Sequence, residues 1–156
     1  MSGFKGHIMP TGYSGTPLPR KLGFSDSTCL VVLGEPDGYA ALLGPIPAGL
    51  ERQPGITVST NLVHVFVTQR QELVGHLGAL RATLRPEAVI WVSWPKKASK
   101  VATDVTEDRI REVALPLGLV DVKVCAVSEV WSGLKLVVRK ELRAQGAALS
   151  ERPAQT

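Results

Sequence analysis

The sequence predicts an α/β fold: a three-layer sandwich around a mostly parallel sheet whose last strand runs antiparallel. Three observations predict it. From Cys29 onward, apolar strand-like runs alternate with segments of helical periodicity, an order typical of a sheet covered by helices on both faces. The run "LVHVFVT" lacks polar alternation, as expected of a strand buried on both faces. The last two apolar runs are joined only by "SEVWS", which is too short for a parallel crossover.

The chain of 156 residues is long enough to form one domain with a substantial core. We expect a flexible leader over residues 1–12, a single α/β domain over 13–140 and a loosely ordered tail over 141–156. The start lacks the apolar segment of a secretory signal, and the apolar runs are too short to span a membrane. Cys29 and Cys125 both lie in apolar runs, so we expect reduced thiols in a cytoplasmic protein.

The formal net charge is +4. Residues 139–156 hold four basic and two acidic side chains, so half of that charge lies near the end of the chain. The remainder is small, which argues against nucleic acid as a partner.

Residues that typically begin and end helices predict the first elements. In "GTPLPRKLG", Thr16 is the expected N-cap, Pro17 the first helical residue and Gly23 the stop. "CLVVL" then forms a buried strand.

A turn and a second short helix come next. The turn covers Gly34 to Gly38, and the helix has Asp37 as its expected N-cap and ends at Gly44. The Pro/Gly-rich segment that follows holds one short edge strand, either around Leu50 or around residues 56–58.

The second half shows clearer periodicity. Four leucines recur at helical spacing after "LVHVFVT", and "AVIWVSW" is the next buried strand. The leucines are Leu73, Leu77, Leu80 and Leu84. A later helix has Thr106 as its N-cap, with Glu107 and Asp108 in the first turn, where the helix dipole favours acids. The strands "LVDVKVCAV" and "GLKLVVRK" complete the domain as an antiparallel pair.

This ending, a strand, a helix, a strand and a closely linked antiparallel last strand, resembles the class I S-adenosylmethionine-dependent methyltransferase fold. So does "VVLGEPDGY", placed where such enzymes have their first strand and glycine loop. The resemblance implies a Rossmann-like sandwich and makes S-adenosylmethionine a possible cofactor. As a set, "GYSGTPLPRKLG", "ALLGPIP", "VHVFVT", "WPKKASKVATDVTED" and "VDVKVCAVSEVWSGLKLVVRKE" resemble an uncharacterised bacterial family, domain of unknown function 3052. That resemblance implies no particular activity.

Ligands of open α/β sheets bind beyond the carboxyl ends of the strands. Lysines there hold acidic ligands, and aromatic rings stack on planar ones. The alternative is that the lysines are ordinary surface residues and the tryptophans complete the core. The candidate ligand-binding residues are Gly34, Asp37, Gly38, Thr68, Arg70, Trp94, Lys96, Lys97, Ser99, Glu129 and Trp131, with Tyr13 on an arm that folds over them.

The turn from Gly34 to Gly38 differs from a cofactor loop. Pro36 lacks an N–H group, and the carboxylates of Glu35 and Asp37 repel a pyrophosphate, so the spacing disfavours dinucleotides. S-adenosylmethionine carries no phosphate, and Glu51 is the only nearby acid for its ribose. A simple strand-to-helix turn is the alternative.

No catalytic residue or metal site is expected. "GYSGT" lacks the second glycine of a nucleophile elbow. The three histidines, His7, His64 and His76, do not stand at metal-ligand spacing from a cysteine or from one another.

The sequence therefore predicts a binding module for a small anionic or planar ligand or a protein partner. A divergent methyltransferase is one alternative. Weak nucleic-acid binding through Lys96, Lys97, Lys100 and the basic tail is another.

Overall fold

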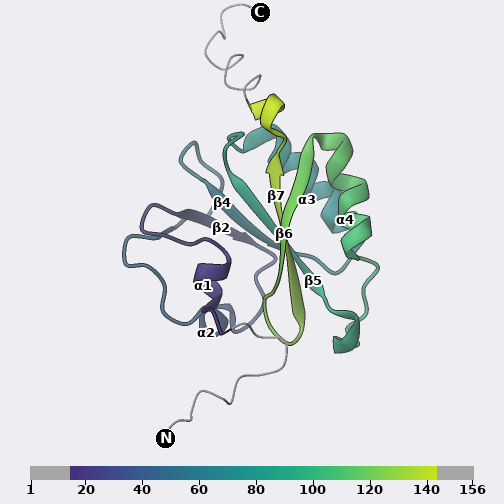
Figure 1. The fold of residues 1–156 in the computed structure, drawn as a ribbon, viewed down its shortest axis with the longest axis horizontal. Helices are drawn as coiled ribbons and strands as arrows, with labels where there is room; N and C mark the ends of the chain where they lie inside the picture. The colour runs from purple at the N-terminus through teal and green to yellow at the C-terminus, as the bar shows by residue number, and fades with distance from the viewer. Residues whose placement is uncertain (1–14, 144–156) are drawn as a thin grey trace, which may run out of the picture.

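A computed structural model describes residues 15–143 of the protein. Its centre is a six-stranded sheet in the order β3-β2-β4-β5-β7-β6 (Figure 1). Strand β7 is antiparallel to both of its neighbours, and the pairs among β3, β2, β4 and β5 are parallel, as predicted. The strands are β2 (Cys29–Leu33), β3 (Glu51–Arg52), β4 (Leu62–Phe66), β5 (Val89–Pro95), β6 (Leu119–Ala126) and β7 (Trp131–Val138).

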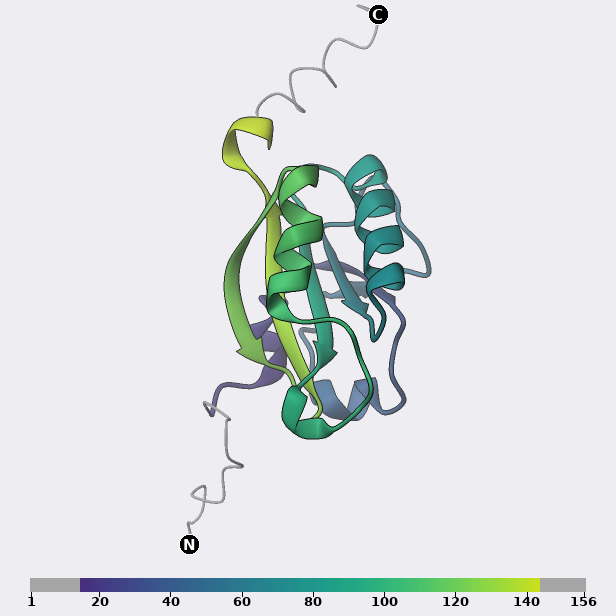
Figure 2. The same ribbon diagram turned by 90° about the vertical axis from the view of Figure 1, so that its right-hand side faces the viewer.

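Helices cover both faces of the sheet, which confirms the three-layer sandwich. The longer helices α3 (Arg70–Thr83) and α4 (Glu107–Ala114) lie on one face, and the short helices α1 (Leu18–Lys21) and α2 (Tyr39–Leu43) lie on the other (Figures 1 and 2). Two 3-10 turns, η1 (Lys97–Ser99) and η2 (Leu115–Leu117), follow β5 and α4.

The sheet separates two apolar clusters. Along β5, Ile90, Val92 and Trp94 pack with α3 and α4, whereas Trp91 points to the α1 and α2 side. This alternation is that of a strand buried on both faces. The indole N–H of the fully buried Trp91 donates to the Leu22 carbonyl at 2.9 Å, so the α1 segment is attached to the middle of the sheet.

Two of the expected N-caps in the first half are wrong. Pro17 is the N-cap of α1, not its first residue, and Thr16 lies outside the helix. Gly38 is the N-cap of α2 in place of Asp37, because its left-handed φ of 80° turns the chain into the helix. The expected stop is confirmed, since Gly23 follows the C-cap of α1 with φ 82°.

The edge strand β3 begins directly after Leu50, so the first of its two expected positions is confirmed. Gly44 ends α2 as predicted. Residues 140–143 form a helical turn after β7. The expected leader over 1–12 and most of the expected tail over 141–156 lie outside the described residues.

Both long helices begin with side-chain caps. The Glu72 carboxylate accepts from the backbone N–H groups of Thr68 and Gln69, a cap that the leucine spacing did not reveal. At α4, the Thr106 hydroxyl accepts from the Arg109 N–H at 3.2 Å, which confirms the predicted N-cap.

We expect Thr106→Ala to lower the free energy of unfolding by about 1 kcal/mol, because the Arg109 N–H at the start of α4 loses its acceptor. Thr106→Ser keeps a hydroxyl at the same position and serves as the matched control. Urea titration of both variants measures the difference. Equal losses in the alanine and serine variants would contradict a capping role.

Candidate functional site

The loops after β4 and β5 meet at the carboxyl edge of the sheet. The Thr68 carbonyl accepts from the Thr103 hydroxyl at 2.5 Å and from the Asp104 N–H at 3.3 Å. The Asp104 carboxylate in turn accepts from the Arg70 N–H at 2.6 Å. We call residues 96–100, which hold Lys96, Lys97 and Lys100, the lysine loop. The structure thus places the two predicted residues Thr68 and Arg70 against the segment that follows this loop. Their polar backbone atoms hold the loops together.

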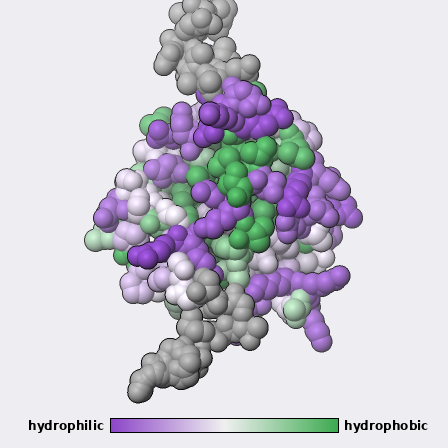
Figure 3. Space-filling view, in the orientation of Figure 1, coloured by the Kyte–Doolittle hydropathy of each residue, from purple (hydrophilic) through white to green (hydrophobic). Residues whose placement is uncertain are grey.

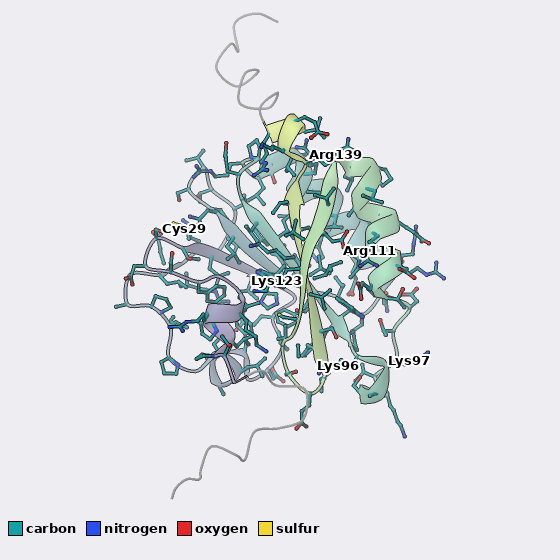
Figure 4. The ribbon with its side chains drawn as sticks, viewed as in Figure 1. Cys29, Lys96, Lys97, Arg111, Lys123 and Arg139 are labelled. Atoms are coloured by element: carbon teal, nitrogen blue, oxygen red, sulfur yellow. The ribbon has the colours of Figure 1, made fainter. Side chains whose placement is uncertain are left out.

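The lysine loop is attached to the β6–β7 link. The Lys96 N–H donates to the Val130 carbonyl at 2.7 Å, and the Ser99 hydroxyl donates to the Lys96 carbonyl at 2.6 Å. The Ser99 hydroxyl therefore has a partner inside its own turn. Lys97 is exposed and points away from the domain (Figure 4). Glu129, in the neighbouring link, is exposed as well.

The two predicted tryptophans pack against the core. Trp94 is only 8% exposed and belongs to the cluster under α3 and α4. Trp131 is half-buried on the opposite side, where its ring meets the Phe66 ring edge-to-face at 5.0 Å. Such packing accounts for both side chains without a ligand.

Gly34 is required by a close approach of two backbones. A Cβ atom at this position would lie 2.4 Å from the Phe66 carbonyl oxygen of β4, and φ is 69°. Beside it, Glu35 forms an ion pair with Arg52 of β3. The turn is therefore closed onto β4 and β3, while Asp37 and Gly38 remain exposed.

Glu51 lies at the wrong end of the sheet to serve a ligand near Gly34. It pairs with Cys29, the first residue of β2, whereas Gly34 follows the last. At the usual rise of a strand, roughly 16 Å separates Cys29 from Gly34 along the chain. The combination of the glycine turn with Glu51, which a ribose site requires, is not formed.

A buried polar chain crosses the α1 and α2 side of the sheet. The Tyr39 hydroxyl lies 2.8 Å from His64 Nδ1, and His64 Nε2 lies 2.8 Å from the Ser93 hydroxyl. All three residues are at most 1% exposed. The sequence contains one signal for this buried polar network. His64 is the single polar residue in "LVHVFV", and a buried imidazole needs hydrogen-bond partners.

Burial shifts the pKa values of two members of this chain. It lowers the pKa of His64 from its ordinary 6.5 to about 3, so the imidazole is neutral. It also raises the pKa of the Tyr39 phenol, partly offset by the nearby Arg52 guanidinium. Tyr39, His64 and Ser93 thus form a neutral hydrogen-bonded network, in which one imidazole nitrogen donates and the other accepts.

An apolar pocket of about 140 Å³ lies between α2 and β3. Leucine, isoleucine and phenylalanine side chains line it, together with Tyr39 and Arg52. The Arg52 guanidinium stands 5.9 Å from the centre of the Tyr39 ring. We call this cavity the α2–β3 pocket.

Two further cavities adjoin α1. One, of about 290 Å³, lies beside α2, and the other, of about 370 Å³, lies beside β6. None of the predicted site residues among 15–143 lines any of these three cavities. Tyr13 lies outside the described residues. The predicted cleft at Trp94 therefore stays a prediction.

Within residues 15–143, no three His, Cys, Asp or Glu side chains cluster closely enough to hold a metal ion. Over the same range, none of the helices has the length and apolar character needed to cross a membrane. Cys29 and Cys125 are both free thiols.

Comparison with solved structures confirms the Rossmann-like, methyltransferase-type fold. A Sulfolobus solfataricus protein assigned as a type 11 methyltransferase superposes with a TM-score of 0.54 at 8% identity, covering 79% of this chain and 90% of its own. The B. subtilis M1A22 tRNA methyltransferase TrmK gives 0.52 at 9% identity, with coverages of 78% and 65%. A variant of LepI, solved in complex with SAH and a substrate analogue, gives 0.52 at 12% identity. The match covers 80% of this chain but only 47% of LepI.

No curated protein matches the sequence. A family model does: it covers residues 58–140, from the segment before β4 to the end of β7. That region is more than half of the chain and holds His64, Ser93 and the lysine loop. The chain belongs to the family described as protein of unknown function (DUF3052).

Proposed function

We propose that this protein is a binding module for small acidic molecules and that the α2–β3 pocket is its binding site. The observation that carries the proposal is an apolar cavity whose lining, as far as the structure describes the chain, holds one cation, Arg52. Small-molecule sites combine an apolar lining with a few orienting polar groups in this way.

The size of the pocket limits the ligand. A cavity of about 150 Å³ holds a benzene ring, and the α2–β3 pocket has about 140 Å³. One ring fits among its apolar side chains. Arg52 then selects a carboxylate on that group, because guanidinium and carboxylate form paired, charge-assisted hydrogen bonds. The ligand class is therefore a one-ring carboxylic acid.

Glu35 competes with such a ligand for Arg52. The two side chains of this ion pair are 47% and 41% exposed, and exposed pairs contribute little to stability. A ligand carboxylate can replace Glu35 at small cost. The pair positions the guanidinium over the Tyr39 ring, at the wall of the pocket.

Titration calorimetry with benzoate, phenylacetate and phenylpropionate tests the proposal. We expect at least one of these acids to bind and Arg52→Met to weaken it about tenfold or more, because a charge-assisted hydrogen bond is lost. Glu35→Gln should strengthen binding, since it removes the competing carboxylate. Failure of all three acids to bind, or equal affinity for the Arg52→Met variant, would contradict the proposal.

Two exposed alanines of α2 offer a matched control. Ala40 lines the α2–β3 pocket, whereas Ala41 lines the cavity on the other side of the helix. Ala40→Leu should block binding and Ala41→Leu should leave it unchanged. The two variants add the same side chain to the same helix, so a general effect on α2 would appear in both.

S-adenosylmethionine is the second candidate ligand, favoured by the likeness of the fold to methyltransferases. Two features argue against it: Gly34 is packed on the Phe66 carbonyl, and Glu51 lies beside Cys29. A melting temperature that rises with S-adenosylmethionine concentration would favour this candidate over the acid-binding module.

A further inference from the structure

Basic side chains gather in the groove between α1 and β6. The groove has a volume of about 370 Å³. Of the lining residues within 15–143, three are basic and none is acidic; the basic ones are Arg20, Lys21 and Lys123. Arg20 and Lys21 come from the last turn of α1 and Lys123 from β6. Lys123 lies beside β6 on the side of α1 (Figure 4).

A fourth cation lies directly beside this groove. Lys123 of β6 is the cross-strand partner of Lys135 of β7, so both side chains stand on the same face of the sheet. Two positive charges placed opposite each other in an antiparallel pair repel and destabilise the sheet. A bound anion removes that cost.

None of the acidic side chains that the structure describes lines this groove. Within residues 15–143, ion pairs form at Arg52, Arg85 and Arg111, and none involves Arg20, Lys123 or Lys135. The nearest acid in β6, Asp121, bonds to Arg111 of α4 at 3.0 Å. A shift in register between Asp121 and Lys123 separates the two side chains. Asp121 therefore pairs with Arg111 of α4 and leaves the groove positive.

Contacts between α1 and β6 fix the shape of the groove. The Lys21 ammonium donates to the Ala126 carbonyl at 2.8 Å, which ties the helix to the strand. Cys125 also lines the groove, and its thiol is half-buried. Burial raises the pKa of this thiol, and the positive charges of Lys21 and Lys123 oppose the shift. The thiol therefore lies within the electrostatic field of the basic cluster.

We propose that this groove binds a small molecule carrying a multiply charged phosphate group. Four cations around one groove match an anion with several charges, and lysine ammonium groups act as point charges for phosphate. The groove is open on one side and has the volume of a small-molecule site.

Longer anions fit this surface less well. Among the described residues, no aromatic side chain lines the groove, so nucleic-acid bases have no stacking partner in this part of the chain. An acidic peptide strand would add to the open edge of β6, but the irregular register between Asp121 and Lys123 interrupts that edge. Figure 3 shows a band of hydrophobic side chains in the middle of this face of the molecule. Val122 and Val124 of β6 are exposed, and apolar side chains offer nothing to an extended anion.

Titration of the full chain with pyrophosphate at constant ionic strength tests the site. We expect saturable shifts of backbone NMR signals confined to Arg20, Lys21, residues 123–126 and residues 133–135. Lys123→Gln and Lys135→Gln should each weaken binding about tenfold or more, and Arg109→Gln, at an exposed cation of α4 on the other face of the sheet, should not. Absence of saturable shifts at this face would overturn the proposal.

The melting temperatures of the ligand-free variants show whether Lys123 and Lys135 bind an anion or stabilise the sheet. If Lys123 and Lys135 are held together for an anion, replacing either by glutamine at low salt should leave the melting temperature unchanged or raise it. A lower melting temperature in both variants would show that the lysines stabilise the sheet instead. Saturable binding of polyglutamate or single-stranded DNA, without binding of pyrophosphate, would also overturn the proposal.

Cys125 reports on occupancy directly. The sequence has two cysteines, so Cys29→Ser leaves Cys125 as the single thiol. In that variant, pyrophosphate should slow alkylation of Cys125 by iodoacetate, because both anions use the same basic groove. An alkylation rate that does not change with pyrophosphate would count against the site. The result is independent of the α2–β3 pocket, which none of these basic residues lines.

Discussion

Gly34→Ala should destabilise the protein by about 3 kcal/mol, enough to lower the melting temperature by roughly 10 °C. Two effects add. The added Cβ would lie 2.4 Å from the Phe66 carbonyl oxygen, which is backbone and has no rotamer with which to move away. The residue must also hold φ at 69°, a left-handed conformation that costs an alanine about 1 kcal/mol. Thermal unfolding followed by circular dichroism measures the change.

Gly38→Ala is the matched control for this variant. Gly38 lies at the other end of the same turn with φ 80°, but apart from its chain neighbours no atom of the described residues stands within 4 Å of its Cβ position. The substitution therefore introduces the conformational strain without the collision, and we expect a loss of only about 1 kcal/mol. Equal effects of the two substitutions would mean that the approach of Gly34 to β4 does not constrain the fold.

The same comparison bears on function. Gly34 and Gly38 are both predicted ligand-binding residues because their turn lies at the carboxyl edge of the sheet, where a cofactor loop would place glycines. At Gly34 the approaching group is the Phe66 carbonyl of β4. A glycine required by a neighbouring strand and a glycine required by a cofactor look alike in a single sequence.

Periodicity predicted most of the fold, because burial determines residue type. The run "LVHVFVT" corresponds to β4 between two parallel neighbours, and the leucine spacing corresponds to α3. The short link "SEVWS" correctly predicted the antiparallel ending. Local caps were less predictable: Thr106 begins α4, but Gly38 replaces Asp37 at α2 because backbone conformation decided there.

The cavities could not be predicted from sequence. The α2–β3 pocket combines residues from Phe24 to Arg52 that share no spacing rule. The groove beside α1 joins Arg20 to Lys123, about a hundred positions later. Lysines in "WPKKASK" stand out because they are adjacent in the chain, yet Lys123 and Lys135 become neighbours only when β6 pairs with β7. Charge clusters made by strand pairing are hidden in the sequence.

Acid should destabilise this protein through His64. The imidazole is fully buried, and its pKa in the folded state is lowered from 6.5 to about 3. Above pH 6.5 it is neutral in both the folded and unfolded states, so its contribution to stability is fully present. Below pH 6.5 the unfolded chain binds a proton that the folded protein excludes. Stability is then lost progressively until the pH reaches about 3.

The expected loss in the free energy of unfolding is large. At about pH 4.5 the difference in proton binding corresponds to on the order of 2 to 3 kcal/mol. Urea titrations between about pH 7.5 and about pH 4.5 measure the slope, to which carboxylates also contribute. His64→Gln keeps a donor and an acceptor between Tyr39 and Ser93 but does not titrate, so its slope should be smaller than that of the wild type.

His76→Gln is the matched control, because this residue lies partly exposed on α3, outside the polar chain, and its loss should leave the effect of His64 in place. NMR of the His64 ring supplies a measurement that does not depend on any variant. Its carbon-bound protons should show no titration from neutral pH down to about pH 4, because the Tyr39 and Ser93 hydroxyls bond the neutral ring and no carboxylate does. A ring that titrates near pH 6.5, or equal slopes for wild type and His64→Gln, would mean that water reaches the imidazole. The hydrogen-bonded side chains of Tyr39, His64 and Ser93 would then be accessible to solvent and would not form part of the closed core.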